Sequence, residues 1–480
     1  MRRLPLLPHL LVLPLVVVLG CRTGARGVPG PDADAIVEGR VDSTVHTDTI
    51  TDQFTVALNR ARWSARTRVQ EGTDFWSDVA VLDMASAQRA AQSLDERTFV
   101  FALQTLMASD PEGAAVAFGA LYSSAKDPVV RGRSRVGLTM ALSWSSDWPR
   151  LARVTTNVDS TFADAAEAER QSSVERWAQA LADVPAPEVQ VPDDPIVLPM
   201  RRSAFGTPVI TVRVNGRPHE FWLDTGASMT LLSAEVALQT GVYLAAPDTL
   251  ALGVVAGHIP ARAVIIDSLD IGPVKARGLS AAVVEQRMLR LDRRMVHGQM
   301  ESIPIDGVIG TDLLRRMDVV LDAGAGTMTI RRPRPDPRAK RNLYWVGYPV
   351  VKLVTRDGRP VLFGLDTGAE GTYVTTALLR KLPRTAVAAR RMTLGGLGTG
   401  KERTEWVARD VALSDGDYAI SLRNAPVTPE RRWTFVVFDG VIGSDVALAT
   451  RMHLDFTNGV FDIRPSAHVG ETGPSVTVEH

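Results

Sequence analysis

Cysteine is almost absent from this sequence: Cys21 is the only one among 480 residues. A single cysteine excludes a disulfide within the chain. A charge of one sign is lacking too, because 54 basic residues balance 54 acidic ones. The composition therefore gives no indication of nucleic-acid binding. The 8 histidines are scattered without the spacing of metal ligands, so we expect no metal and no cofactor.

The first 21 residues have the features of a targeting segment. Arg2-Arg3 precede an apolar stretch from Leu4 to Leu19, and prolines interrupt this stretch, which argues against a stable membrane-spanning helix. The stretch ends at Gly20-Cys21, which resembles the signal of a bacterial lipoprotein. That resemblance implies an acylated Cys21 and a lipid anchor at the bacterial cell envelope, facing the periplasm or the exterior. A plain cleaved signal peptide is the alternative.

The region from 49 to 184 is rich in alanine and has helical periodicity. Asp110-Pro111 and Asp127-Pro128 each place a capping residue before a first-turn proline, which predicts two helix starts. The pattern fits a small tetratricopeptide-like repeat array or a plain helical bundle, and both remain open. Such a domain could recruit a protein partner, or space the rest of the chain from the membrane.

A repeat dominates the second half of the chain. Phe221–Ala227 recurs as Phe363–Ala369, 142 positions later. Each copy is followed by an Asp-Gly-Val-Ile-Gly run, Asp306–Gly310 and Asp439–Gly443, where the offset becomes 133. The first copy thus carries extra residues before Asp306, which we place in the arginine-rich stretch 287–294. Two blocks in register with one length difference indicate a duplicated domain.

Each copy has the local pattern of a small β unit. Asn215-Gly216 and Asp357-Gly358 are two-residue hairpin signals, because such turns need positive φ. The apolar segments before Asp224 and Asp366 predict strands. Apolar runs around a glycine predict further hairpins at 320–330 and 453–463.

These residues resemble the lobes of a retropepsin-like aspartic protease. The resemblance rests on Asp-Thr-Gly-Ala at 224–227 and 366–369 with the later Val-Ile-Gly segments, and it covers about 196–332 and 343–465. It implies an N-terminal all-α helical domain followed by an all-β bilobal, retropepsin-like β-barrel fold, with two tandem lobes in one chain. The expected segments are a signal peptide (1–21), a tether (22–48), a helical domain (49–184), lobe 1 (185–332), a linker (333–342), lobe 2 (343–466) and a disordered tail (467–480).

The resemblance implies that Asp224 and Asp366 form a catalytic pair for peptide hydrolysis. Two carboxyl groups held close together cannot both ionise cheaply, so the pair shares one proton and titrates as a unit. The ionised member accepts a proton from the attacking water, and the protonated member donates to the substrate. The substrate would be a peptide or protein.

Other residues have supporting roles by the same resemblance. Thr225 and Thr367 would bond across to the opposite lobe, while Gly226 and Gly368 would allow close backbone approach. The copies differ at Trp222/Gly364, which predicts unequal walls for the cleft. The expected substrate-binding positions beside the loops and in two flaps are Ser228, Glu370, Gly253, Gly257, Gly396 and Gly398.

Four further aspartates have a structural interpretation. We expect Asp306 and Asp439 to be turn residues, and Asp312 and Asp445 to cap or begin short helices. Two functional alternatives to a single-chain endopeptidase remain open. One is an inactive protease fold that binds a peptide or an assembly partner, and the other pairs lobes from two chains.

Overall fold

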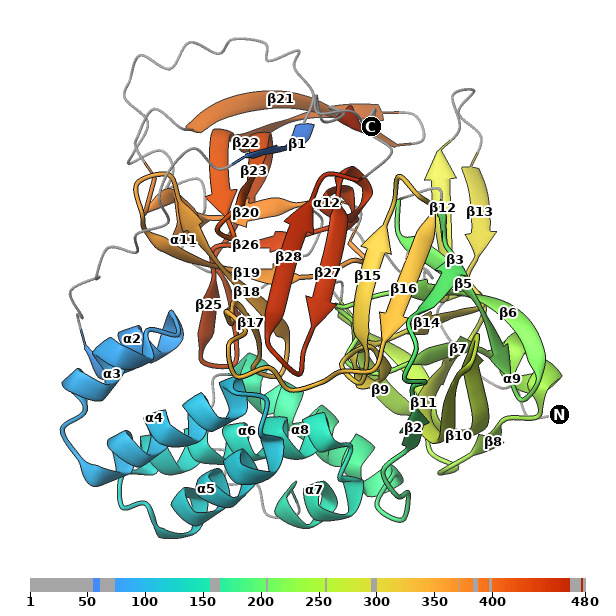
Figure 1. Cartoon of the computed structure of the whole chain (residues 1–480), viewed down its shortest axis with the longest axis horizontal. Helices are drawn as coiled ribbons and strands as arrows, with labels where there is room; N and C mark the ends of the chain where they lie inside the picture. The colour runs from blue at the N-terminus through green and yellow to red at the C-terminus, as the bar shows by residue number, and fades with distance from the viewer. Residues whose placement is uncertain are drawn as a thin grey trace, which may run out of the picture.

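The computed structural model describes most of the chain beyond its N-terminal segment (Figure 1). The described residues are 55–60, 74–155, 165–203, 206–254, 257–294, 300–369, 371–382, 387–396, 399–466 and 476–477. The predicted signal peptide, the tether and the lipidation site Cys21 lie outside them, as do Glu370 and Gly398.

A helical region follows a short first strand. Its helices are α2 (Phe75–Ala80), α3 (Met84–Ala90), α4 (Leu94–Met107), α5 (Pro111–Ser124), α6 (Pro128–Ser145), α7 (Trp148–Thr155) and α8 (Ala165–Ala180). As the sequence predicts, Asp110 accepts from Gly113 N at 2.9 Å at the start of α5, and Asp127 accepts from Val129 N at 2.7 Å at the start of α6. Consecutive helices pack on one another, an arrangement that a repeat array and a bundle share. None of the described helices is long and apolar enough to cross a membrane.

The start of the predicted helical domain differs from the expectation. Thr55–Arg60 forms strand β1, which pairs with β23 in the second half of the chain. Val56 is buried in that core. Within the predicted disordered tail, Val476–Thr477 forms β29 and pairs with β1.

The first β unit extends from β2 to β16 and is built around a closed ring of strands, β11–β7–β14–β6–β5–β10, in which β10 and β11 complete the circle. Its elements are β2 (Glu188–Gln190), β3 (Ile196–Pro199), β4 (Arg201–Arg202), β5 (Pro208–Val214), β6 (Arg217–Leu223), β7 (Leu231–Ser233), α9 (Ala234–Thr240), β8 (Tyr243–Leu244), β9 (Leu250–Val254), β10 (Gly257–Ile271), β11 (Val274–Val284), β12 (Arg290–Arg294), β13 (Met300–Pro304), β14 (Gly307–Ile309), α10 (Thr311–Leu314), β15 (Asp318–Asp322) and β16 (Thr327–Arg331). Alternating apolar residues fill the ring, because successive side chains of a strand point to opposite faces.

The second β unit extends from β17 to β28 and repeats this plan. Its ring is β23–β20–β26–β19–β18–β22, closed by the pairing of β22 with β23. Its elements are β17 (Leu343–Trp345), β18 (Pro349–Thr355), β19 (Pro360–Leu365), β20 (Tyr373–Thr375), α11 (Thr376–Leu379), β21 (Val387–Gly396), β22 (Thr399–Ser414), β23 (Tyr418–Thr428), β24 (Arg431–Trp433), β25 (Val436–Phe438), β26 (Gly440–Ile442), α12 (Ser444–Ala449), β27 (Arg451–Asp455) and β28 (Val460–Arg464). The predicted order, a helical region followed by a β-rich region that contains closed barrels, is confirmed.

Two details of the predicted repeat are resolved by the structure. The extra residues of the first copy lengthen the hairpin β12–β13, which corresponds to the shorter hairpin β24–β25. The first predicted hairpin turn has positive φ at both Asn215 and Gly216. The second does not: Gly358 has φ 85, whereas Asp357 accepts a hydrogen bond from Thr355 Oγ1 at 2.6 Å and ties the turn together by its side chain.

A shared sheet joins the two units, in the order β28–β27–β15–β16–β3. Strands β15 and β27 come from equivalent places in the two copies and pair antiparallel, with Val320 opposite His453 at the centre. Figure 1 shows these strands side by side between the two units, with helices α2 to α8 gathered along one side of both.

The helical region packs against both β units. Trp177 of α8 donates to Ala251 O of β9 at 2.9 Å, and Trp148 of α7 donates to Ser280 Oγ of β11 at 3.0 Å. Phe99 of α4 meets Phe435 of the second unit with ring centroids 5.8 Å apart. One apolar core runs through the helices and into both units, so the three parts hold one another in place.

Candidate active site

Each Asp-Thr-Gly loop leaves the ring at the end of a buried strand. Strand β14 runs parallel to β6, and its Ile309 carbonyl accepts from Asp224 N at 3.0 Å. In the second unit Ile442 O accepts from Asp366 N at 2.9 Å. The Val-Ile-Gly segments therefore support both loops from behind through the backbone.

The two loops face each other at the closest approach that their backbones allow. A Cβ atom on Gly226 would lie 2.5 Å from Cγ of Asp366, and one on Gly368 would lie 2.4 Å from Cγ of Asp224. Only a residue without a side chain fits at either place. The two glycines thus bring the aspartate side chains of the two units together.

The threonines of the two loops form a reciprocal hydrogen-bond network. Thr225 Oγ1 donates to Leu365 O at 2.9 Å and accepts from Thr367 N at 2.9 Å. Thr367 Oγ1 donates to Leu223 O at 2.8 Å and accepts from Thr225 N at 3.0 Å. Both threonines are buried. Because every polar group of the network is paired inside the protein, the loops are fixed relative to each other.

The two carboxyl groups have similar backbone partners. Asp224 Oδ1 accepts from Gly226 N at 2.7 Å and from Ala227 N at 3.2 Å, while Asp366 Oδ1 accepts from Ala369 N at 2.9 Å. Asp224 is only 1% exposed. Burial raises its pKa well above the ordinary value, and the charge of Asp366 raises this pKa further. The site therefore favours a pair with one proton.

A family model described as "Aspartyl protease" matches residues 210–313, which contain the first loop and its Val-Ile-Gly segment. Over these residues the chain is similar to aspartyl proteases. Among solved structures, it resembles the aspartic proteinase from Irpex lacteus, with 11% identity over 58% of this chain and 100% of that chain and a TM-score of 0.35. It also resembles a retropepsin-like aspartic protease from Rickettsia conorii, with 18% identity over 30% of this chain and 92% of that chain and a TM-score of 0.19. No curated protein matches the sequence.

The sequence did not point to one residue of this site. Tyr348 lies before β18, and its hydroxyl donates to Asp366 Oδ2 at 3.1 Å. Room for its ring comes from Gly364, where a Cβ atom would lie 3.0 Å from Tyr348 Cε1. The difference between Trp222 and Gly364 was visible in the repeat, and it was the only signal for the tyrosine.

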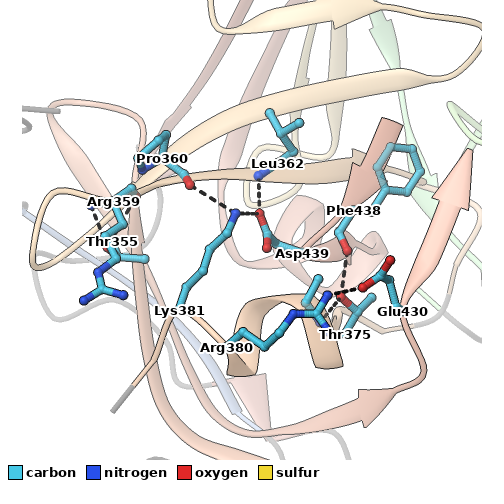
Figure 2. Close-up of polar contacts among 11 residues, drawn as sticks. Thr355, Arg359, Pro360, Leu362, Thr375, Arg380, Lys381, Glu430, Phe438 and Asp439 are labelled. Carbon is cyan, nitrogen blue, oxygen red and sulfur yellow. Dashed lines mark hydrogen bonds and ion pairs between the residues drawn. The ribbon is translucent and has the colours of Figure 1, made fainter. Parts of the chain in front are cut away.

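Asp306 and Asp439 lie outside the pair of Asp224 and Asp366, and each is hydrogen-bonded to a neighbouring strand. Asp306 Oδ2 accepts from Glu220 N at 3.1 Å, and Asp439 Oδ2 accepts from Leu362 N at 2.8 Å, the equivalent position of the second copy. Figure 2 shows that Asp439 also pairs with Lys381, whose Nζ donates to Asp439 Oδ2 at 2.7 Å. The interpretation of these aspartates as mere turn residues was therefore incomplete.

Asp312 and Asp445 lie in the first turns of α10 and α12 but cap neither helix; the N-cap residues are glycines. Asp312 accepts from Thr230 N and Thr230 Oγ1, each at 3.0 Å. Asp445 accepts from Thr372 N at 2.8 Å and from Thr372 Oγ1 at 2.6 Å. The two aspartates thus tie the segment after each Asp-Thr-Gly loop to the helix behind it.

The predicted substrate-binding positions have unequal surroundings. Ser228 is exposed beside the first loop. Gly253 lies in β9 opposite His258, and Gly257 begins β10, so both belong to one long hairpin. Gly396 ends β21 opposite Thr399 in the corresponding hairpin β21–β22. These hairpins occupy the places in the chain where the flaps were expected.

Proposed function

We propose that this protein is an aspartic endopeptidase that uses Asp224 and Asp366 to activate water. The observation that carries the proposal is that Gly226 and Gly368 each lie against the carboxyl group of the opposite loop, where the two carboxyl groups interact. The paired threonine hydrogen bonds support it, because catalytic groups must be held within a few tenths of an ångström.

In the proposed reaction one carboxyl group is ionised and the other is protonated. The ionised group takes a proton from water while the water oxygen bonds to the carbonyl carbon of the peptide. The protonated group donates its proton to the carbonyl oxygen. The tetrahedral intermediate then collapses, the C–N bond breaks, and a proton passes to the leaving nitrogen.

The test is cleavage of a diverse peptide library by the full-length protein at about pH 4–8, beside Asp224→Asn and Asp366→Asn. We expect each variant to lose at least about 10²-fold in kcat, since general acid–base catalysis contributes 10²–10⁴-fold. Asp306→Asn is the matched control, because this aspartate contacts Glu220 N and its side chain is 40% exposed.

Full turnover by either site variant would show that the pair is wrong. Binding of peptides without cleavage at any pH would instead identify a peptide-binding module. Specific activity that rises with protein concentration would indicate lobes paired between two chains.

We also propose a lipid anchor at Cys21 and a location at the bacterial cell envelope, on the basis of the sequence alone. Metabolic labelling with a fatty-acid analogue should mark the protein, and Cys21→Ser should abolish the label. Equal labelling of the variant would contradict the anchor. A protein partner of the helical region remains a separate proposal.

A further inference from the structure

The two carboxyl groups of the site differ in their side-chain partners. Asp366 Oδ2 accepts from the Tyr348 hydroxyl at 3.1 Å. Asp224 Oδ2 is buried, and no group outside the carboxylate pair donates a hydrogen bond to it in the described part of the chain. A protein whose two units repeat each other so closely therefore has an unequal pair at its centre.

The inequality has a clear origin in the repeat. With the offset of 142 positions, Tyr348 corresponds to Gly206, and Gly364 corresponds to Trp222. In the first unit the large residue is Trp222, on the strand before Asp224. In the second unit it is Tyr348, on the segment before β18. Gly206 cannot become a tyrosine, because its Cβ would lie 2.4 Å from Leu448 Cδ1 and its φ is +88.

The ring of Tyr348 is held firmly in this position. Trp433 lies 5.2 Å and Phe438 lies 5.7 Å from it, measured between ring centroids, and Gly364 lies under its edge. These neighbours on β24, β25 and β19 carry no charge. Its hydroxyl contacts the titratable group Asp366, whose charge acts in turn on Asp224.

We propose that Tyr348 is a positioning residue that makes Asp366 the ionised member of the pair and leaves the proton on Asp224. A hydroxyl that donates to a carboxylate stabilises its ionised form. Asp224 is almost fully buried beside a second carboxylate, which disfavours its ionised form. The proposal rests on the proposed function for its consequence: Asp366 takes the proton from water, and Asp224 donates to the carbonyl oxygen.

Tyr348→Phe tests this inference, since it removes the hydroxyl and keeps the ring. The acid limb of kcat/KM against pH reports the lower macroscopic pKa of the pair. We expect this limb to move up by about one pH unit in the variant, because a hydrogen bond to a charged group is lost. At pH values below this limb, kcat/KM of Tyr348→Phe should then be up to about tenfold lower than that of the native protein.

Tyr344→Phe is the matched control. Tyr344 donates to the backbone carbonyl of Arg341 at 3.1 Å, so this variant removes a hydroxyl that serves no carboxylate. Its acid limb should stay in place. A change of kcat in Tyr348→Phe that is equal at all pH values would show a merely structural role and overturn the inference.

A second measurement does not depend on turnover. The 13Cγ signal of Asp366, identified by its loss in Asp366→Asn, is titrated in the native protein and in Tyr348→Phe. We expect the Asp366 signal to titrate about one pH unit higher in the variant. Identical titrations would overturn the role of Tyr348, whereas absence of cleavage by the native protein would count only against the proposed function.

Discussion

The two β units hold equivalent aspartates in different surroundings. In the first unit Asp306 lies 3.5 Å from His219 Nδ1, and its side chain is 40% exposed. In the second unit Asp439 lies 2.7 Å from Lys381 Nζ, and its side chain is 2% exposed. Burial raises the pKa of Asp439, although Lys381 acts in the opposite direction.

Both units share the hydrogen bonds between this aspartate and the backbone. Asp306 and Asp439 both accept from the strand that leads into the Asp-Thr-Gly loop, and their own carbonyls accept from Ser233 N and Thr375 N. The side-chain partner, in contrast, differs: it is His219 in the first unit and Lys381 in the second. Duplication has therefore preserved the contacts that position the loops, while the electrostatic surroundings diverged.

The largest expected effect comes from removing the buried cation of the second unit. Lys381→Met would leave the Asp439 carboxylate buried without its counter-charge, which we expect to lower the free energy of unfolding by about 3–5 kcal/mol. His219→Met in the first unit should cost less than about 1 kcal/mol, because water reaches Asp306. Urea unfolding followed by tryptophan fluorescence measures both.

A double variant sharpens this contrast. Asp439→Asn keeps an oxygen that accepts from Leu362 N and removes the charge, so combining it with Lys381→Met should recover most of the loss. Equal costs for Lys381→Met and His219→Met would mean that the two surroundings do not differ energetically.

Much of the fold could be predicted from local rules. The helix starts at Asp110 and Asp127 follow from capping chemistry, and the hairpin at Asn215-Gly216 follows from its need for positive φ. The pairing of Asp224 and Asp366 was expected from the resemblance of both copies to protease lobes, in addition to the repeat in register. These features depend on residues that are close in sequence or duplicated.

The features that escaped prediction depend on packing between distant segments. Tyr348 lies 18 residues before Asp366, and the first copy has a glycine in its place, so no motif marks it. Strand β1 pairs with β23, far along the chain, and its sequence Thr-Val-Ala-Leu-Asn-Arg lacks the strict apolar alternation that identifies a strand. Comparing residue sizes between the two copies, position by position, would have revealed the exchange of Trp222 and Tyr348.

The two units differ again at the turn of their long hairpins. In the first, β10 and β11 meet closely, and Asp270 is bound to Arg277 at 2.8 Å. Burial alone would raise the pKa of Asp270, but Arg277 and Lys275 outweigh it and hold this pKa below its ordinary value. In the second, Asp415 accepts only backbone N–H groups, those of Tyr418 and Ile463, among its hydrogen bonds in the described residues. Burial raises its pKa to about 6.

An effect smaller than that of Lys381→Met is expected from the pH dependence that these two aspartates give to stability. Asp415 binds its proton more tightly in the folded protein, so its contribution is complete below about pH 4 and is lost as the pH rises through about 6. The loss is at most about 3 kcal/mol, and partial exposure reduces it. Asp270 has the opposite sign, because its lowered pKa stabilises the fold at neutral pH and this contribution is lost as the pH falls. Thermal unfolding from about pH 2 to pH 7 should therefore show Asp415→Asn gaining stability relative to the native protein as the pH rises from about 4 to above 6. Asp270→Asn should lose stability relative to the native protein as the pH rises through the range below about 4. Parallel curves for the two variants would contradict the assignment, since only opposite shifts in pKa separate them.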